Sequence, residues 1–246
     1  MAGRPADATA ERRFAGRTLI AFAVALAAAG LFAVLLVLVR SSAGGLLRVD
    51  RSTTDTLHRF AVSQPSFTSA MRLLSAVGTT AAWAVVMLLV CAWLVYRRLF
   101  RLAVFVVVTA AGSILLNNLI KLAVSRARPH LADPVAYAAG KSFPSGHAQA
   151  AIVGYGVLVV VFLPAVPRRA RGLLVLAAST MVVLIGFSRI ALGVHYLSDV
   201  IGAFLIGTVW LLGMIAAFRA WRRDDGRADT GLGGGLEPES SDRLAP

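Results

Sequence analysis

The sequence predicts an all-α polytopic membrane protein with six transmembrane helices in a bundle. The chain of 246 residues is 58% hydrophobic and only 15% charged, whereas soluble domains carry about a quarter charged residues. Six uncharged apolar stretches approach or exceed the roughly 20 residues that a helix needs to cross a bilayer. Because they are continuously apolar, they exclude the alternating pattern of a membrane β-barrel. The stretches are Thr18–Val39, Leu73–Tyr96, Leu102–Ile120, Ala148–Pro167, Gly172–Ser188 and Val200–Phe218.

The first stretch follows a basic segment that contains Arg12, Arg13 and Arg17. A secretory signal peptide also begins with basic residues, but its apolar region is only about 7–15 residues long. We therefore expect an uncleaved first helix, and residues 1–17 are expected to form an N-terminal tail.

Arginines gather in alternate connections, within residues 4–17, 97–101, 168–171 and 219–227. Short loops rich in arginine stay in the cytoplasm, so we expect both termini to be cytoplasmic. The net charge of +13 thus reflects membrane topology. Nucleic-acid binding is excluded, because the sequence offers no soluble face that carries basic and aromatic residues together.

The longest external connection runs over residues 41–72. Leu57 and Phe60 alternate with Arg51, His58 and Arg59, which favours a short interfacial amphipathic helix. A solvated loop is equally compatible with the pattern, and we expect His58 to lie at its surface. The chain has a single cysteine inside the second apolar stretch, so disulfides and cysteine-based metal sites are excluded.

The third stretch leads into a first polar cluster, in which Arg128 follows Lys121 and immediately precedes Pro129. Proline disfavours continuation of a helix, so Arg128 can fold back over the membrane surface. Basic side chains at helix ends also reach the headgroups simply to keep their charge in water. Either residue alone has this simpler interpretation.

A second cluster, Pro144-Ser145-Gly146-His147, stands directly before the fourth stretch. Ser145 is a natural N-cap, and Gly146 lets the backbone come close to a ligand. The free N–H groups and positive dipole end of a helix N-terminus bind phosphate well. For this cluster alone, an ordinary capped helix with an interfacial histidine is the alternative.

The third cluster joins the fifth and sixth stretches: Ser188-Arg189 is followed by His195 and Asp199. Residues four apart share one helix face, so Asp199 can accept the Nδ1–H of His195 and leave Nε2 free as a nucleophile. A metal site would need three or four ligands, and the neighbouring cations oppose it. A structural ion pair between Asp199 and Arg189 remains open.

Together, Lys-x6-Arg-Pro, Pro-Ser-Gly-His and Ser-Arg-x5-His-x3-Asp resemble the three signatures of the type 2 phosphatidic acid phosphatase superfamily. All specified positions match, within a resemblance that covers residues 18–220. The resemblance implies a metal-independent integral membrane phosphatase without a cofactor. Its implied substrates are lipid phosphate monoesters or diphosphates, of the phosphatidate, phosphatidylglycerol phosphate or polyprenyl diphosphate type.

The resemblance also implies roles for the site residues. His195 would attack phosphorus and form a phosphohistidine, and Asp199 would hold the histidine tautomer. His147 would protonate the leaving alkoxide and then help to activate water. The phosphate-binding residues would be Lys121, Arg128, Ser145, Gly146 and Arg189.

Three further polar residues, Arg126, His130 and Lys141, lie between the first two clusters on the same side of the membrane. General attraction to anionic headgroups would explain them. The sharper hypothesis is that they contact a second phosphate of the substrate. The sequence does not choose between the candidate lipids.

The same cations could serve a membrane protein that binds or moves lipid phosphates without hydrolysing them. Binding alone, however, needs no nucleophile, orienting carboxylate and acid. We therefore predict a six-helix phosphatase domain over residues 18–220 in a bacterial plasma membrane, with its site on the extracytoplasmic side and a lipid phosphate as its partner. Residues 221–246 are rich in Gly, Asp, Glu and Ser, which predicts a disordered cytoplasmic tail.

Overall fold

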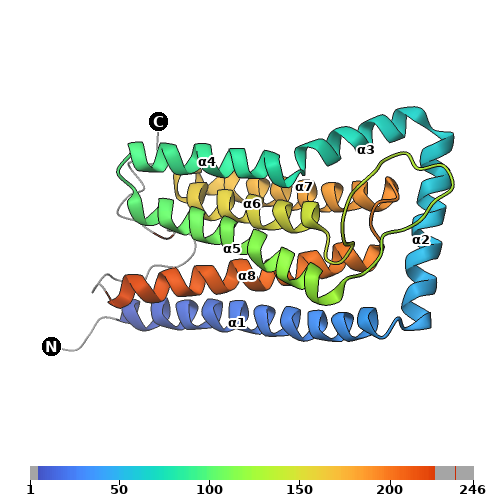
Figure 1. Cartoon of the computed structure of the whole chain (residues 1–246). Helices are drawn as coiled ribbons and strands as arrows, with labels where there is room; N and C mark the ends of the chain where they lie inside the picture. The colour runs from blue at the N-terminus through green and yellow to red at the C-terminus, as the bar shows by residue number, and fades with distance from the viewer. Residues whose placement is uncertain (1–4, 225–235, 237–246) are drawn as a thin grey trace.

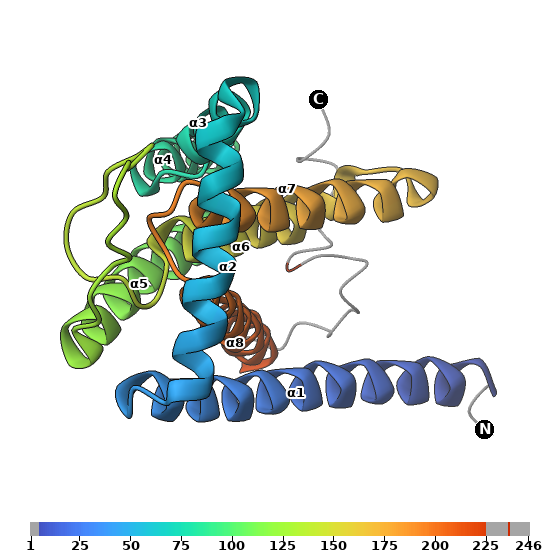
Figure 2. The same ribbon diagram turned by 90° about the vertical axis from the view of Figure 1, so that its right-hand side faces the viewer.

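The structure, a computed structural model, describes residues 5–224 and residue 236. Within these residues the chain is helical and has no strand. Figures 1 and 2 show a bundle of long helices with one helix, α2, lying across its end. The helices are α1 (Pro5–Arg40), α2 (Gly44–Ser63), α3 (Pro65–Val77), α4 (Thr80–Tyr96), α5 (Phe100–Val124), α6 (Gly146–Phe162), α7 (Arg171–Ala191) and α8 (Leu197–Asp224).

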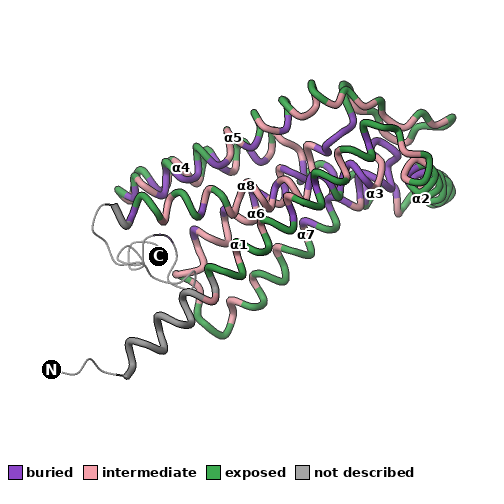
Figure 3. Tube along the Cα trace, turned by 90° about the horizontal axis from the view of Figure 1, so that it is seen from below, coloured by how far each residue is buried: buried purple, intermediate pink, exposed green. Residues whose placement is uncertain are grey.

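In the described part of the chain, five segments are long and apolar enough to cross a membrane, or six if one bent helix pair counts as a single span, which confirms the predicted all-α polytopic fold. Five are single helical segments, and the sixth is the α3–α4 pair, which bends by 42°. Exposed residues lie mostly on the outward faces of the helices, and buried residues lie on their inward faces (Figure 3). The single segments are Thr18–Arg40, Phe100–Val124, Gly146–Ala165, Arg168–Ala191 and Leu197–Arg222.

The two expected tails differ in outcome. α1 begins at Pro5, so the helix continues upstream of the first apolar stretch through residues expected to form a tail. At the other end, α8 runs on to Asp224. The predicted disordered tail lies outside the described residues from residue 225 onward, apart from residue 236.

The apolar stretch Leu73–Tyr96 predicts one continuous helix, and this prediction is wrong near its start. α3 ends at Val77, with Gly78 as its C-cap, and the hydroxyl of Thr79 accepts the N–H of Ala82 at 3.1 Å to cap the start of α4. A Cβ at Gly78 would overlap the side chain of Ile185 on α7. Hydropathy does not register such a break, because the interrupting residues are small and uncharged.

α6 lies at the centre of the bundle and packs against α4, α5, α7 and α8. Glycines allow these helices to approach closely, as small residues do in membrane bundles. Gly154 faces the ring of Trp83 on α4, and Gly156 faces Leu211 on α8; a Cβ at either glycine would overlap its neighbour. α1 lies at one edge of the bundle, and its main contact is along α8 (Figures 1 and 2).

Replacing Gly154 by alanine is expected to destabilise the protein by about 1–3 kcal/mol, because the added methyl group must displace the Trp83 ring from a packed core. Gly213→Ala on α8 is the matched control, since nothing lies within 4 Å of the Cβ it would add. Thermal unfolding of both variants in detergent provides the measurement. Equal melting temperatures for the two variants would contradict the packing argument.

The connection over residues 41–72 is helical, which decides between the two expectations in favour of the amphipathic helix. The buried face of α2, however, is mainly polar, comprising Asp50, Thr54, His58 and Ala61. The expectation that His58 lies at the surface is wrong, since its exposed fraction is only 7%. α2 packs this face onto α7 and α8, which brings it to the end of the bundle where the sequence clusters meet.

Candidate active site

The three sequence clusters meet at the end of the bundle that α2 covers. The start of α1 and the end of α8 lie at the opposite end of the bundle (Figure 1). A cavity of about 510 Å³ opens there. Residues of all three clusters line it: Lys121, Arg128, Gly146, His147, Arg189 and His195. The structure therefore collects cations and both motif histidines from segments that are far apart in sequence.

A tight turn between α7 and α8 places His195. The N–H of Val194 donates to the Arg189 carbonyl at 3.2 Å, and the N–H of Gly193 donates to the Ile190 carbonyl at 2.9 Å. This pair of bonds is the Schellman arrangement that ends many helices, and it requires a left-handed residue. Gly193 supplies it with a φ of +70°, so that the chain reverses and His195 faces the cavity.

The hydrogen bonds of His195 define its tautomer. Nε2 lies 3.0 Å from Nη1 of Arg128, and Nδ1 lies 3.3 Å from Oδ2 of Asp199. A guanidinium can only donate, so Nε2 must be the acceptor and Nδ1 must carry the proton. Burial lowers the pKa of His195 to about 4, against the opposing effect of Asp199. The imidazole is therefore neutral at physiological pH, with its lone pair directed toward Arg128 and the cavity.

Asp199 is held from several sides. Its Oδ2 accepts the N–H of Tyr196 at 2.9 Å and the hydroxyl of Ser142, while Oδ1 accepts Nη1 of Arg126 at 2.7 Å. The ion pair with Arg189 that the sequence left open is not the one formed. Arg189 instead donates to the hydroxyl of Ser75 on α3. Asp199 is thus fixed as the acceptor for the Nδ1–H of His195.

Arg128 folds back over the site, as the proline after it favours. Its guanidinium donates to the carbonyl oxygens of Ala139 at 3.0 Å, Gly140 at 3.1 Å and Val194 at 2.8 Å. These contacts tie the loop over residues 125–145 to the α7–α8 turn. The arginine is consequently positioned by backbone oxygens and carries its charge at the wall of the cavity.

The N-terminus of α6 faces the same cavity. Nζ of Lys121 lies 3.5 Å from the place that a Cβ on Gly146 would occupy, so the glycine leaves room beside the ammonium group. Ser145 is the N-cap residue, but its hydroxyl makes no capping hydrogen bond. That hydroxyl is buried and has no partner among the described residues. Ser145 itself is not among the residues that line the cavity.

None of the three additional substrate-contact candidates lines the cavity. Arg126 is engaged by the carboxylates of Asp50 and Asp199, each at 2.7 Å, so the hypothesis of a substrate contact is wrong for this residue. His130 and Lys141 are exposed on the loop. They lie at the same end of the molecule as the cavity, as the sequence order predicts, but they are not among its lining residues.

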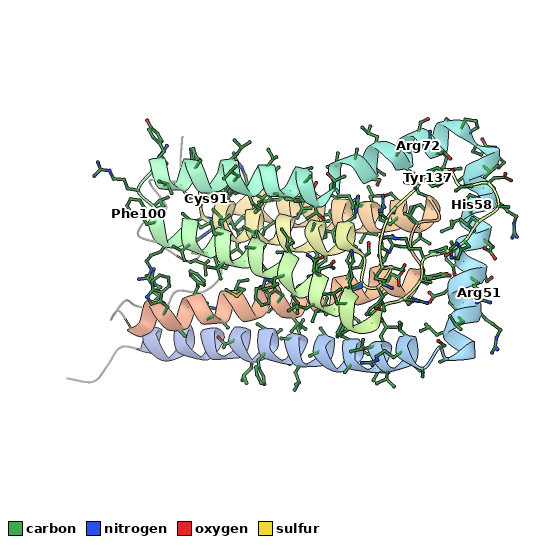
Figure 4. All side chains as sticks on the ribbon, in the orientation of Figure 1. Arg51, His58, Arg72, Cys91, Phe100 and Tyr137 are labelled. Atoms are coloured by element: carbon green, nitrogen blue, oxygen red, sulfur yellow. The ribbon has the colours of Figure 1, made fainter. Side chains whose placement is uncertain are left out.

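Two residues that sequence reasoning missed, Arg72 of α3 and Tyr137 of the loop, do line the cavity. Figure 4 shows both at the same end of the bundle. Arg72 donates through Nη2 to the Val135 carbonyl at 2.9 Å and thereby links α3 to the loop. A cation directly before the start of an apolar stretch was the available signal, but such residues are common at membrane surfaces.

Two smaller hollows lie beside the cavity, among α4, α5 and α6. Lys121 and Gly146 also line a neighbouring polar hollow of about 130 Å³, together with Asn117, Asn118 and Gln149. An apolar groove of about 40 Å³ adjoins it through shared wall residues of α4, α5 and α6. Charge, hydrogen-bonding groups and apolar surface thus follow one another with depth.

Within the described part of the chain, no group of three or more His, Cys, Asp or Glu side chains is arranged to hold a metal ion. Fold and site together define an α-helical integral membrane protein with a buried, cation-rich histidine centre. The sequence profile of the PAP2 superfamily matches residues 101–223. The chain belongs to the PAP2 superfamily, which confirms the resemblance drawn from the three clusters.

Two comparisons give nearer relatives. The chain is 36% identical to phosphatidylglycerophosphatase B of Bacillus subtilis (strain 168) over 95 residues, which are 38% of this chain and 46% of that protein. The match therefore spans about half the length of the curated relative. The crystal structure of a transmembrane PAP2-type phosphatidylglycerolphosphate phosphatase from Bacillus subtilis has the same fold, with a TM-score of 0.71 at 23% identity, covering 78% of this chain and 94% of that one.

Proposed function

We propose that this protein is a metal-independent lipid phosphate phosphatase that acts through a phosphohistidine intermediate. The observation that carries the proposal is the environment of His195. Its Nδ1 faces Asp199 and its Nε2 faces Arg128, inside the cavity that Lys121, Arg189 and His147 also line. A neutral imidazole oriented by a carboxylate is the arrangement that nucleophilic catalysis requires.

The reaction begins when a phosphate group enters among the cations. Arg128 exchanges its contact with Nε2 of His195 for a phosphate oxygen, which frees the lone pair. Arg189, Lys121 and the N–H groups at the start of α6 hold the remaining oxygens and stabilise the charge that develops. The unpaired hydroxyl of Ser145 adds one donor.

Nε2 of His195 then attacks phosphorus, a P–N bond forms, and the P–O bond to the lipid breaks. His147 gives its proton to the leaving oxygen, so the lipid departs as an alcohol, or as a monophosphate when the substrate is a diphosphate. In the second step His147 takes a proton from water, whose oxygen attacks phosphorus and releases inorganic phosphate and His195. Positioned proton transfer of this kind contributes about 10²- to 10⁴-fold in rate.

His147 must carry a proton in the first step although it shares the cavity with Lys121, Arg128 and Arg189. The phosphate itself resolves this conflict, because its negative charge offsets the three cations and favours the imidazolium. Binding of the substrate therefore favours protonation of His147, which is the acid that cleavage of that substrate requires. His195, which must stay neutral, is protected by burial and by the donor on its Nε2.

The sequence of surfaces along the cavity supports a lipid substrate. Beside the cations lies the polar hollow, and beyond it the apolar groove between α4 and α5. The order of these surfaces is the order of a phosphate, a polar backbone and an apolar tail in a lipid phosphate. The name of the Bacillus relative makes phosphatidylglycerol phosphate our first candidate, ahead of phosphatidate and polyprenyl diphosphate.

The site is proposed to lie on the outer side of a bacterial plasma membrane, with both termini in the cytoplasm. Arginine-rich connections at residues 97–101 and 168–171 support this orientation, since they join helices at the end of the bundle opposite α2. A labelling reagent that cannot cross the membrane tests it, in a Cys91→Ala background with one cysteine introduced at Lys141 and, in a separate variant, at Arg98. If only the cysteine introduced at Arg98 is labelled in intact cells, the orientation is the opposite of the one proposed.

Phosphate release by the purified protein in detergent tests the proposed function. The three candidate lipids are assayed with EDTA present, and His195→Ala gives the background. We expect release that EDTA does not reduce, and a phosphoenzyme that is labile in acid and stable in alkali. Rates that collapse with EDTA would reject the histidine mechanism. Binding of the lipids without release would favour the alternative, a lipid-phosphate binding protein.

A further inference from the structure

Asp50 is a fully buried carboxylate, with 0% of its surface exposed, on the helix α2 that covers the end of the bundle. Its Oδ1 accepts the backbone N–H of Ser198 at 2.9 Å, and its Oδ2 accepts the Ser198 hydroxyl at 2.5 Å. Ser198 lies in the first turn of α8, directly before Asp199. Since a helix N-terminus favours an anion, Asp50 holds α2 onto the start of α8.

Arg126 connects Asp50 to the histidine centre. Nη2 lies 2.7 Å from Oδ2 of Asp50, and Nη1 lies 2.7 Å from Oδ1 of Asp199. The guanidinium also lies over the ring of Tyr196, 4.4 Å from its centroid. Because the guanidinium fork is planar and rigid, these contacts fix the two carboxylates relative to each other.

The charges of the three linked side chains do not cancel. Asp50 and Asp199 carry two negative charges, and Arg126 carries one positive charge between them. The excess negative charge is available to the Nδ1–H of His195, which points at Asp199. If Arg126 paired with Asp199 alone, the cation would neutralise the carboxylate and weaken it as an acceptor. By sharing Arg126, Asp50 limits how far that cation weakens Asp199 as the acceptor for the Nδ1–H of His195.

We propose that Asp50 is a positioning residue of the active centre, acting on His195 through Arg126 and Asp199. It lies outside residues 101–223, the segment that matches the family. The inference assigns α2 a part in catalysis, and its kinetic test rests on the proposed phosphatase function. Arg126, which the sequence suggested as a substrate contact, acts here as the connecting group.

Asp50→Asn tests the proposal, because asparagine keeps the shape and an oxygen for Ser198 but loses the charge. We expect kcat to fall about 10- to 100-fold, as it does when outer partners of a site residue are removed, while KM stays near its wild-type value. Asp55→Asn, on the exposed side of the same helix, is the matched control and should leave both constants unchanged. Asp50→Glu keeps the charge and should recover most of the loss.

A double variant tests the route. If Asp50 acts through Arg126, Asp50→Asn combined with Arg126→Met should be no slower than Arg126→Met alone, since coupled residues are not additive. Losses that multiply would overturn the proposed route. An Asp50→Asn variant with wild-type kcat would overturn the proposal itself. So would equal losses in Asp50→Glu and Asp50→Asn accompanied by equal falls in melting temperature, because these indicate a purely structural role.

A measurement independent of activity separates this inference from the proposed function. Nitrogen-15 NMR of histidine-labelled protein in detergent reports the tautomer of His195, whose signal is assigned by its loss in His195→Ala. We expect the Nδ1–H tautomer in the wild type and in Asp55→Asn, and a shift toward Nε2–H in Asp50→Asn. An unchanged tautomer in Asp50→Asn would overturn the inference. Absence of phosphate release by the wild type would reject the function and leave the NMR result to decide on Asp50.

Discussion

Replacing His195 by alanine is expected to lower phosphate release by about 10⁴-fold or more, the scale seen when a catalytic nucleophile or base is removed. The methyl group leaves no atom that can form the P–N bond. Lys121, Arg128 and Arg189 remain around the cavity, so lipid phosphate should still bind and KM should change little. Steady-state kinetics with short-chain lipid phosphates in mixed micelles provide both constants.

His130→Ala is the matched control for this experiment, because His130 is an exposed histidine at the same end of the molecule and outside the cavity. Its rate should equal that of the wild type. A His195→Ala variant that keeps a large share of the activity and still forms a phosphoenzyme would transfer the nucleophile's role to another residue. His147, which lines the same cavity, would then be the next residue to test.

Asp199→Asn is expected to reduce kcat by about 10³- to 10⁴-fold, the range found when the carboxylate behind a catalytic histidine becomes an amide. The amide NH₂ group would face Nδ1 as a donor, which favours the tautomer with the proton on Nε2. That tautomer has no lone pair at the attacking atom, and its N–H would meet the guanidinium of Arg128, which lies 3.0 Å away.

Because Asp199 also pairs with Arg126, its variant must be checked for folding as well as for rate. Thermal unfolding in detergent gives that check, and Asp133→Asn, an exposed aspartate on the loop, controls for the substitution itself. We expect a much larger change in kcat than in the melting temperature. A rate loss no greater than that of Asp133→Asn would show that the carboxylate does not set the tautomer.

The sequence predicted the spans and the centre because both leave local signals. Uncharged runs mark segments that can cross a bilayer, and residues four apart, such as His195 and Asp199, share one face of a helix. The break before Thr79 leaves no comparable signal, since a cap of small residues does not interrupt the apolar run. The helix α2 left a partial one: Asp50, Thr54 and His58 repeat every four residues, which places them on one helix face but does not indicate that this face is buried.

The function of Arg126 could not be predicted from the sequence at all. Its position between Lys121 and Arg128 suggests a contact to a second phosphate of the substrate, and only the three-dimensional structure shows that it pairs with a carboxylate from α2. The same holds for Ser75, whose hydroxyl receives Arg189 from a helix far away in sequence. Contacts between distant segments depend on packing, and neither periodicity nor spacing encodes their partners.

The pairing of α1 with α8 has a consequence for biosynthesis. During translation α1 enters the membrane well before α8, the helix along which it packs, has left the ribosome. α1 therefore lies in the membrane without this packing partner until the last span is synthesised. That same span brings Asp199, so its docking supplies α1 with a partner and His195 with its carboxylate. A chain truncated before the last span would insert into the membrane and retain most of the cations of the site, but it would have no catalytic activity.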